Sequence, residues 1–171
     1  MLKMKKNLLT YLVLALLFTG CSKDDGPVSE AIGLERVPAP LVTIDPTGST
    51  AIDLANPGAF HAKFNVGLYF PNDAPPQKFD IIVRKNGDNS NVKLLQAGVT
   101  TFPTAFDVTA AQLVTIFGAP IAQNDTYDFG VDVYSRSGKK YEAFPVVGLG
   151  YAAAFQPDHP GFNTTLRYKA L

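Results

Sequence analysis

The sequence contains no tryptophan, only one cysteine and only two methionines among its 171 residues. A single cysteine cannot form a disulfide within the chain, so a disulfide-stapled fold is excluded. Neither sign of charge is in excess, because 15 lysines and arginines balance 15 aspartates and glutamates. Without net positive charge the chain has no overall field that attracts nucleic acid, and we expect no nucleic-acid partner.

Long hydrophobic runs are scarce, and the one at the start of the chain is short. Residues 8–18 are apolar apart from Thr10, and Lys3, Lys5 and Lys6 precede them. A helix of this length spans about 16 Å, much less than the ~30 Å hydrocarbon core of a bilayer, so the run cannot serve as a stable membrane-spanning anchor. A basic start followed by a short apolar run is typical of a signal peptide.

The only cysteine, Cys21, directly follows the sequence Leu-Phe-Thr-Gly at positions 17–20. This stretch resembles the lipobox of bacterial lipoproteins, with Phe18 standing where leucine is usual. The resemblance implies that residues 1–20 are removed and that Cys21 carries a diacylglycerol thioether and an amide-linked acyl chain such as palmitate. Two or more acyl chains give stable anchoring. The alternative, an ordinary small buried cysteine, leaves a lone thiol at the end of an export signal unexplained.

The residues after the cysteine, 22–25, read Ser-Lys-Asp-Asp. Acidic residues at this place resemble the export signal of surface lipoproteins in the Bacteroidetes, which implies an outer-membrane protein facing the cell exterior. A plain polar tether is the alternative. Residues 22–40 mix charges, glycines and prolines without a period of 2 or 3.6, as is typical of a linker. We therefore expect a signal peptide (1–20), a lipidated cysteine with a flexible tether (21–40) and one domain (41–171).

From residue 41 onward, apolar and polar residues alternate, which predicts β-strands with one face toward a core. The most secure strand covers residues 60–70, with Phe60, Phe64 and Phe70 among its inward positions. Further strands are predicted at residues 41–45, 79–84, 92–95, 104–108, 127–134, 140–147 and 164–169.

One helix is well marked between two of these strands. Thr109 and Gln112 fit a capping box, in which each side chain binds the other residue's backbone amide. Gly118 suits the position just after a helix, and Pro120 prevents its continuation. The pattern predicts a two-turn helix over residues 110–117 that bridges two sheets.

Seven or eight short strands with one short helix favour an all-β fold, a β-sandwich of the immunoglobulin or fibronectin type III kind. Residues 78–144, including the Val-Thr-x-x-x-Leu segment at 108–113, resemble the N-terminal sandwich domain of SusE-type outer-membrane lipoproteins. In that family the domain mainly holds other domains away from the membrane, and glycan binding lies in later domains. The resemblance therefore implies a spacer role rather than direct carbohydrate binding.

The sequence offers little that could catalyse a reaction or hold a metal. His61 lies on the outward phase of a strand and His159 in a turn, and neither belongs to a set of three or four converging ligands. The Gly-x-Ser-x-Gly nucleophile motif is absent, and lipidation of Cys21 would remove the only thiol. We therefore expect no enzymatic activity, no cofactor and no metal, with a hydrolase as the least favoured alternative.

Two groups of acidic residues also have a simpler interpretation than metal binding or catalysis. Residues 88–91, Asp-Asn-Ser-Asn, suggest a calcium loop, but Lys93 and Val99 stand where an EF-hand needs glycine and glutamate. Asp128 and Asp132 are four residues apart on one predicted strand, about 13 Å, which is too far for a glycosidase pair. A solvated turn and an exposed sheet face are the simpler interpretations.

The remaining candidates for binding are aromatic residues on outward strand positions and in the C-terminal loop. The candidate ligand surface comprises Tyr69, Tyr134, Asp132, Tyr151, Phe155 and Phe162. Sugars stack on such rings, and Asp132, Lys63 or Asn65 could orient them. The alternative is that the rings cover sheet edges or pack under the C-terminal loop, and the lack of tryptophan, the best stacking platform, counts against a dedicated glycan-binding module.

These features favour a non-enzymatic outer-membrane surface lipoprotein, an accessory or spacer component of a SusC/SusD-like system for glycan or nutrient uptake. Its partners would be the membrane, through the lipid anchor, and a TonB-dependent transporter or SusD-like protein. The alternative is an adhesin or carbohydrate-binding module that holds polysaccharide on exposed tyrosines.

Overall fold

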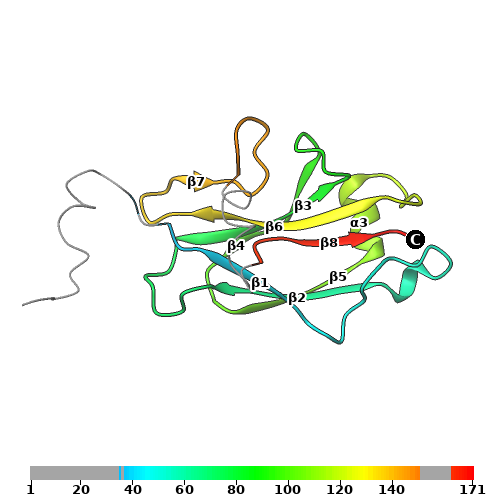
Figure 1. The fold of residues 1–171 in the computed structure, drawn as a ribbon, viewed down its shortest axis with the longest axis horizontal. Coiled ribbons are helices and arrows are strands. Elements are labelled where there is room, and N and C mark those ends of the chain that lie inside the picture. Colours follow the sequence, from blue (N-terminus) through cyan, green and yellow to red (C-terminus); the bar gives the residue numbers. More distant parts are fainter. Residues whose placement is uncertain (1–34, 36, 151–162) are drawn as a thin grey trace, which may run out of the picture. The chain divides into compact units, whose positions relative to one another are not determined.

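The computed structural model describes residues 35, 37–150 and 163–171. The chain divides into two compact units, Met1–Arg36 and Val37–Leu171, and the strands and helices given below all lie in the second. Two antiparallel sheets pack together with one α-helix between two of their strands, so within the described residues the predicted all-β sandwich is confirmed (Figure 1).

The first sheet has three strands and the second has five. The three-stranded sheet has the order β1 (Pro40–Ile44), β2 (His61–Leu68) and β5 (Thr104–Thr109). The five-stranded sheet has the order β4 (Val92–Val99), β3 (Lys78–Lys85) and β6 (Thr126–Tyr134), followed by β7 (Lys140–Tyr141) and β8 (Leu166–Lys169). Both β7 and β8 pair with β6, β8 along its first half and β7 at its end.

Aromatic rings from both sheets fill the core between them. The ring of Phe64 on β2 lies 5.3 Å from that of Phe106 on β5 and 5.3 Å from that of Phe129 on β6, so it joins the two sheets. Tyr168 on β8 meets both Phe60 and Phe129 edge-on. These inward positions alternate with outward ones along each strand, as the sequence predicts.

The predicted helix is confirmed as α3 (Ala110–Phe117), which connects β5 in one sheet to β6 in the other. The backbone amide of Thr109 donates to Gln112 Oε1 at 2.8 Å, and that of Gln112 donates to Thr109 Oγ1 at 3.3 Å. Gly118 ends the helix with a φ of 65°, a conformation that glycine adopts without a steric penalty. Leu113 is the fully buried anchor of this helix.

The predicted strand at residues 140–147 is wrong beyond its second residue, because β7 ends at Tyr141. The backbone amide of Ala143 donates to Asp132 Oδ1 at 2.9 Å instead of to a neighbouring strand, and this turns the chain out of the sheet. We call residues 143–150 the covering segment. The prediction for residue 70 is also wrong, since β2 ends at Leu68 and Phe70 is 55% exposed.

A short segment without a strand signal holds the end of the chain in place. Ile52 pairs in parallel with Ala170, and its amide donates to Lys169 O at 2.9 Å. The amide of Leu171 donates back to Ile52 O at 2.9 Å. The end of the final strand therefore lies between the start of β6 on one side and residues 52–54 on the other.

Removing the hydroxyl of Tyr168 is expected to stabilise the domain. Tyr168 is 2% exposed, and its hydroxyl has no hydrogen-bond partner among the described residues. A buried hydroxyl without a partner costs free energy, so Tyr168→Phe should raise the free energy of unfolding by about 1 kcal/mol in chemical denaturation. Tyr127→Phe is the matched control, because the Tyr127 hydroxyl interacts with Lys85 and Asp125 and its loss should destabilise. Equal losses in both variants would contradict the expectation.

Candidate functional site

The outer face of the five-stranded sheet carries most of the buried charge in the described residues. Its inward positions are apolar, and the alternating outward positions on the two central strands are mainly polar. These outward residues are Asp80, Ile82 and Arg84 on β3 and Asp128, Gly130, Asp132 and Tyr134 on β6. Antiparallel pairing sets Arg84 opposite Asp128, and Asp80 opposite Asp132.

Phe144 of the covering segment lies on the middle of this face. A Cβ atom added to Gly130 would lie 2.7 Å from Phe144 Cε2, so the ring rests where a side chain is missing. The Arg84 guanidinium stacks on the same ring, 4.1 Å from its centroid. Phe144, Ala143 and Ile82 form a small buried cluster separate from the main core. Phe144 lines a cavity on each of its two sides.

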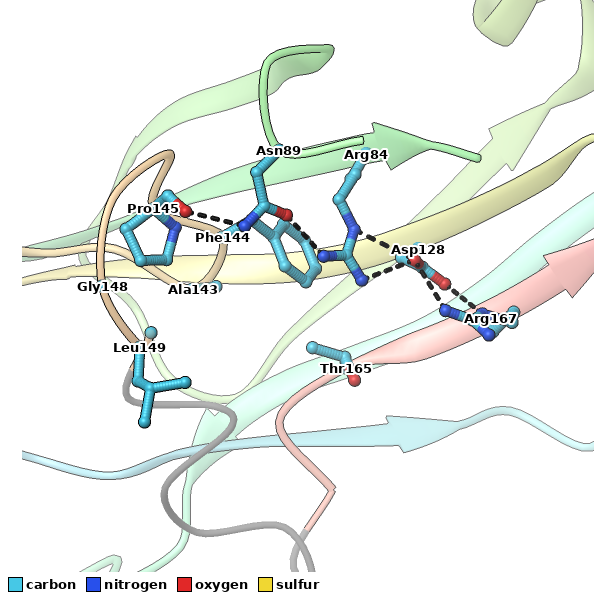
Figure 2. Close-up of a pocket in the computed structure, with 11 residues that line it drawn as sticks. Arg84, Asn89, Asp128, Ala143, Phe144, Pro145, Gly148, Leu149, Thr165 and Arg167 are labelled. Atoms are coloured by element: carbon cyan, nitrogen blue, oxygen red, sulfur yellow. Dashed lines mark hydrogen bonds and ion pairs between the residues drawn. The ribbon is translucent and has the colours of Figure 1, made fainter. Parts of the chain in front are cut away.

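The first cavity has a volume of about 470 Å³ and is built around Asp128 (Figure 2). Asp128 Oδ2 accepts hydrogen bonds from Arg84 Nη2 at 2.8 Å and Nε at 3.1 Å. From the other side, Arg167 on β8 donates through Nε to Oδ1 at 2.5 Å and through Nη2 to Oδ2 at 3.0 Å. Burial alone would raise the pKa of Asp128, but the hydrogen bonds and charges of Arg167 and Arg84 outweigh it and hold that pKa below its usual value.

Asn89 connects this cluster to the covering segment. Arg84 Nη1 donates to Asn89 Oδ1 at 2.6 Å, and Asn89 Nδ2 donates to the carbonyl oxygen of Pro145 at 2.7 Å (Figure 2). The turn at residues 88–91 is therefore structural at this position. Within the part of the chain that the structure describes, no group of three or more His, Cys, Asp or Glu side chains could hold a metal ion.

The second cavity, of about 480 Å³, lies on the other side of Phe144. Asp132 and Tyr134 line it together with Asp80, Lys140 and Glu142. Lys140 Nζ lies 2.9 Å from Asp132 Oδ2 and 3.0 Å from Glu142 Oε1. Burial raises the pKa of Asp132, and Lys140 and the Ala143 amide offset this only in part.

Tyr134 is held in place by two charged neighbours in this second cavity. The Lys78 ammonium lies 4.0 Å from the centroid of its ring, and its hydroxyl hydrogen-bonds to Asp80. Asp80 in turn pairs with Lys78 at 3.2 Å and accepts the amide of Gly98 at 2.8 Å. Burial raises the pKa of the Asp80 carboxyl, but the hydrogen bonds from Gly98 and Lys78 outweigh it, so that pKa lies below its usual value.

The structure changes the interpretation of several predicted site residues. The prediction that Asp128 and Asp132 lie on an exposed face is wrong, because the covering segment and their cationic partners bury both carboxylates. Tyr134 and Asp132 do share a cavity, but Tyr134 is half-buried rather than exposed. Tyr69 is half-buried as well, 4.8 Å from the Phe70 ring, and is not among the residues lining either cavity.

The other predicted residues divide between the opposite sheet and the undescribed part of the chain. Lys63 and Asn65 lie on β2, and His61 there bonds Asp107 at 2.8 Å. Outside the described residues lie Cys21, Tyr151, Phe155, His159 and Phe162.

Sequence reasoning missed Arg84 and Arg167, the two cationic partners of Asp128 on this face. Both occupy outward positions, and both are direct cross-strand partners of Asp128. Asp128 occupies an outward position of one strand, and each of two other strands has an arginine at an outward position. Such a pattern predicts that these strands pair, since opposite charges stabilise cross-strand pairs. That signal was present in the sequence, but it requires knowing that β6 lies between β3 and β8.

Gly130→Ala is expected to displace Phe144. The added methyl group would come 2.7 Å and 2.9 Å from two Phe144 ring atoms and 3.2 Å from Ala143 Cβ. Overpacking of this kind should lower the free energy of unfolding by about 1–3 kcal/mol, measured by chemical denaturation. Gly58→Ala in the 3-10 helix η1 (Pro57–Ala59) is the control, because nothing lies within 4 Å of a Cβ there. Equal stability of the two variants would show that Phe144 does not rest on Gly130.

No helix in the described part of the chain combines the length and hydrophobicity needed to cross a lipid bilayer. No family model matches the sequence, and no curated protein matches it either.

Proposed function

We propose that this chain is a non-enzymatic lipoprotein, held in the outer membrane by acyl chains on Cys21 and facing the cell exterior. Its sandwich domain serves as an accessory or spacer component of a SusC/SusD-like uptake system. The lipobox-like stretch before Cys21 and the acidic residues after it support the location. The likeness of residues 78–144 to SusE-type N-terminal domains supports the role.

One structural observation supports the proposal that the protein has no enzymatic activity. Every buried carboxylate in the described residues forms an ion pair with a lysine or arginine. The pairs are Asp80 with Lys78, Asp125 with Lys85, Asp128 with Arg84 and Arg167, and Asp132 with Lys140. A catalytic acid or base must exchange a proton with a substrate. These carboxylates instead join strands, turns and the covering segment, which supports a rigid domain that works through its surface.

Lipidation and location can be tested together in cells. We expect labelled palmitate to enter the wild-type protein but not a Cys21→Ser variant, and the wild type to fractionate with the outer membrane. Protease added to intact cells should then remove the domain. An unlabelled wild-type protein, or one recovered freely soluble from the periplasm, would overturn the proposed location.

The uptake role has a separate test. Purification of the protein from gently solubilised outer membranes should bring down a TonB-dependent transporter or a SusD-like protein. The matched control is the Cys21→Ser variant, which should not reach the same membrane. Recovery of the lipidated protein without such a partner would remove the uptake role while leaving the location intact.

Direct glycan binding is the second candidate, and one observation favours it. Tyr134 and Asp132 line the same cavity of about 480 Å³, a size in the range of small-ligand sites. This candidate predicts binding on a polysaccharide array that falls in Tyr134→Ala and persists in Tyr69→Ala, whose ring lines neither cavity. An unchanged profile in Tyr134→Ala, with the fold confirmed by circular dichroism, would reject it.

A further inference from the structure

We propose that the first cavity binds an oxyanion, the carboxylate or phosphate group of a small polar molecule, through Arg84 and Arg167. This inference goes beyond the proposed function and does not depend on the lipid anchor or on a transporter. It concerns a different cavity from the one that Tyr134 and Asp132 line.

The cavity has a lining with a net positive charge. Its charged lining residues are Arg84, Arg167 and Asp128, two cations and one anion. One guanidinium would neutralise the Asp128 carboxylate, so the second leaves a net positive charge on the wall. Arg167 can carry that charge at little desolvation cost, because its side chain is 62% exposed while the Asp128 side chain is 4% exposed.

The cavity also offers hydrogen-bond donors to an oxyanion. A guanidinium has five N–H donors in a planar fork that matches carboxylate and phosphate oxygens. Arg84 directs three of them at Asp128 and Asn89. Arg167 directs two at Asp128, and its Nη1 makes no hydrogen bond within the described residues. With respect to the described residues, both arginines therefore keep N–H groups for a further acceptor.

Neighbouring side chains hold these donors in a fixed orientation. Arg84 is held by Asp128 on one side, by Asn89 on another and by the Phe144 ring against its face, so it is already oriented. Asp128 fixes Arg167 through both of its oxygens. Donors that are already oriented lose less side-chain entropy when a ligand binds.

The walls and the volume of the cavity suit a small polar molecule. Phe144, Pro145 and Leu149 give apolar surface, and Thr165 adds a polar group (Figure 2). Leu149 and Thr165 lie on the same side of the row formed by Arg84, Asp128 and Arg167 (Figure 2). A volume of about 470 Å³ suits a molecule of monosaccharide size with an acidic group.

The experiment titrates the full chain, purified in a neutral detergent, with three probes that differ at one carbon. These are glucuronate (carboxylate), glucose 6-phosphate (phosphate) and glucose (neither). Binding is followed by the NMR signals of the arginine Nε–H groups and by calorimetry. We expect saturable shifts of the Arg84 and Arg167 signals with one or both anions, and none with glucose. Binding of one anion alone identifies the oxyanion as carboxylate or phosphate, and both results support the site.

Arg167→Gln should weaken anion binding by about tenfold or more, because it removes a charge-assisted donor pair. Lys169→Gln is the matched control, since it removes the same charge from the same outward face of β8 without touching the cavity. Arg167→Gln keeps the Arg84–Asp128 pair, and circular dichroism checks its fold. The wild-type titration decides the matter even if that variant does not fold.

Three results would each overturn the site. They are the absence of saturable shifts with either anion, shifts of equal size with glucose, and equal losses in Lys169→Gln and Arg167→Gln. None of them bears on lipidation or on a transporter partner, and a failure of those proposals would leave this titration unchanged.

Discussion

Phe129→Ala is expected to lower the free energy of unfolding by about 3–5 kcal/mol, the usual cost of deleting a buried phenylalanine ring. Phe129 is 1% exposed and lies at the centre of β6, opposite Val83 on β3 and Leu166 on β8. Its ring contacts Phe64 of the other sheet and Tyr168 of β8, at 5.3 Å and 5.7 Å between centroids. The truncation would remove both contacts and leave a cavity where the two sheets meet. Urea denaturation at several concentrations measures the loss.

Phe70→Ala is the control for that prediction. Phe70 is the same residue type but 55% exposed, with its one described ring contact to Tyr69. We expect its loss to cost less than about 1 kcal/mol. If Phe129→Ala cost no more than Phe70→Ala, the two sheets would not be packed through this ring.

Asp128→Asn is expected to lower the free energy of unfolding by about 3 kcal/mol, at the lower end for breaking a buried ion pair because Arg167 is largely exposed. The neutral amide would leave two guanidinium groups on the sheet without a counter-charge. It would also loosen Arg84, which holds Asn89 and, through it, the covering segment at Pro145. Asp107→Asn, a half-exposed carboxylate on β5 that bonds His61, is the control and should cost less than about 1 kcal/mol.

The same substitution should change the acid dependence of stability. The folded state holds the pKa of Asp128 below its usual value, so the unfolded chain binds a proton more readily than the folded one as the pH falls. The stabilisation is therefore present above the ordinary aspartate pKa of about 3.9 and is lost as the pH drops through the folded value. Denaturation curves of Asp128→Asn should fall less steeply than wild type below about pH 4. Parallel acid limbs would show that this carboxylate is not selectively stabilised in its charged form.

Local signals in the sequence predicted much of the sandwich, because each depends on neighbouring residues. Alternation along residues 60–68 matches β2, and the pairing of Thr109 with Gln112 matches the start of α3. The end of β2 was not predictable in this way, since Phe70 continues the alternation after the strand has stopped. β4 was underestimated because a bulge and Gly98, with a φ of 71°, interrupt its pattern before Val99.

The candidate site was harder to predict because it depends on contacts between distant residues. Alternation correctly placed Asp128 and Asp132 on the face away from the core, but it carries no information about what covers that face. The cover exists because Asp132 takes the amide of Ala143, and Gly130 leaves room for Phe144. The pairing of Arg84 and Arg167 around Asp128 follows from strand order, which alternation does not specify.

The position of β8 has a consequence for how the domain folds. The end of β8 lies between β6 and residues 52–54. The pairing of residue 52 with residue 170 therefore joins parts of the chain that are far apart in sequence. Folding rates fall as the mean sequence separation of contacts rises, because ordering a long loop costs entropy before the contact forms. We therefore expect refolding on the millisecond-to-second scale typical of β-sandwiches, with the pairing of Ile52 and Ala170 forming late.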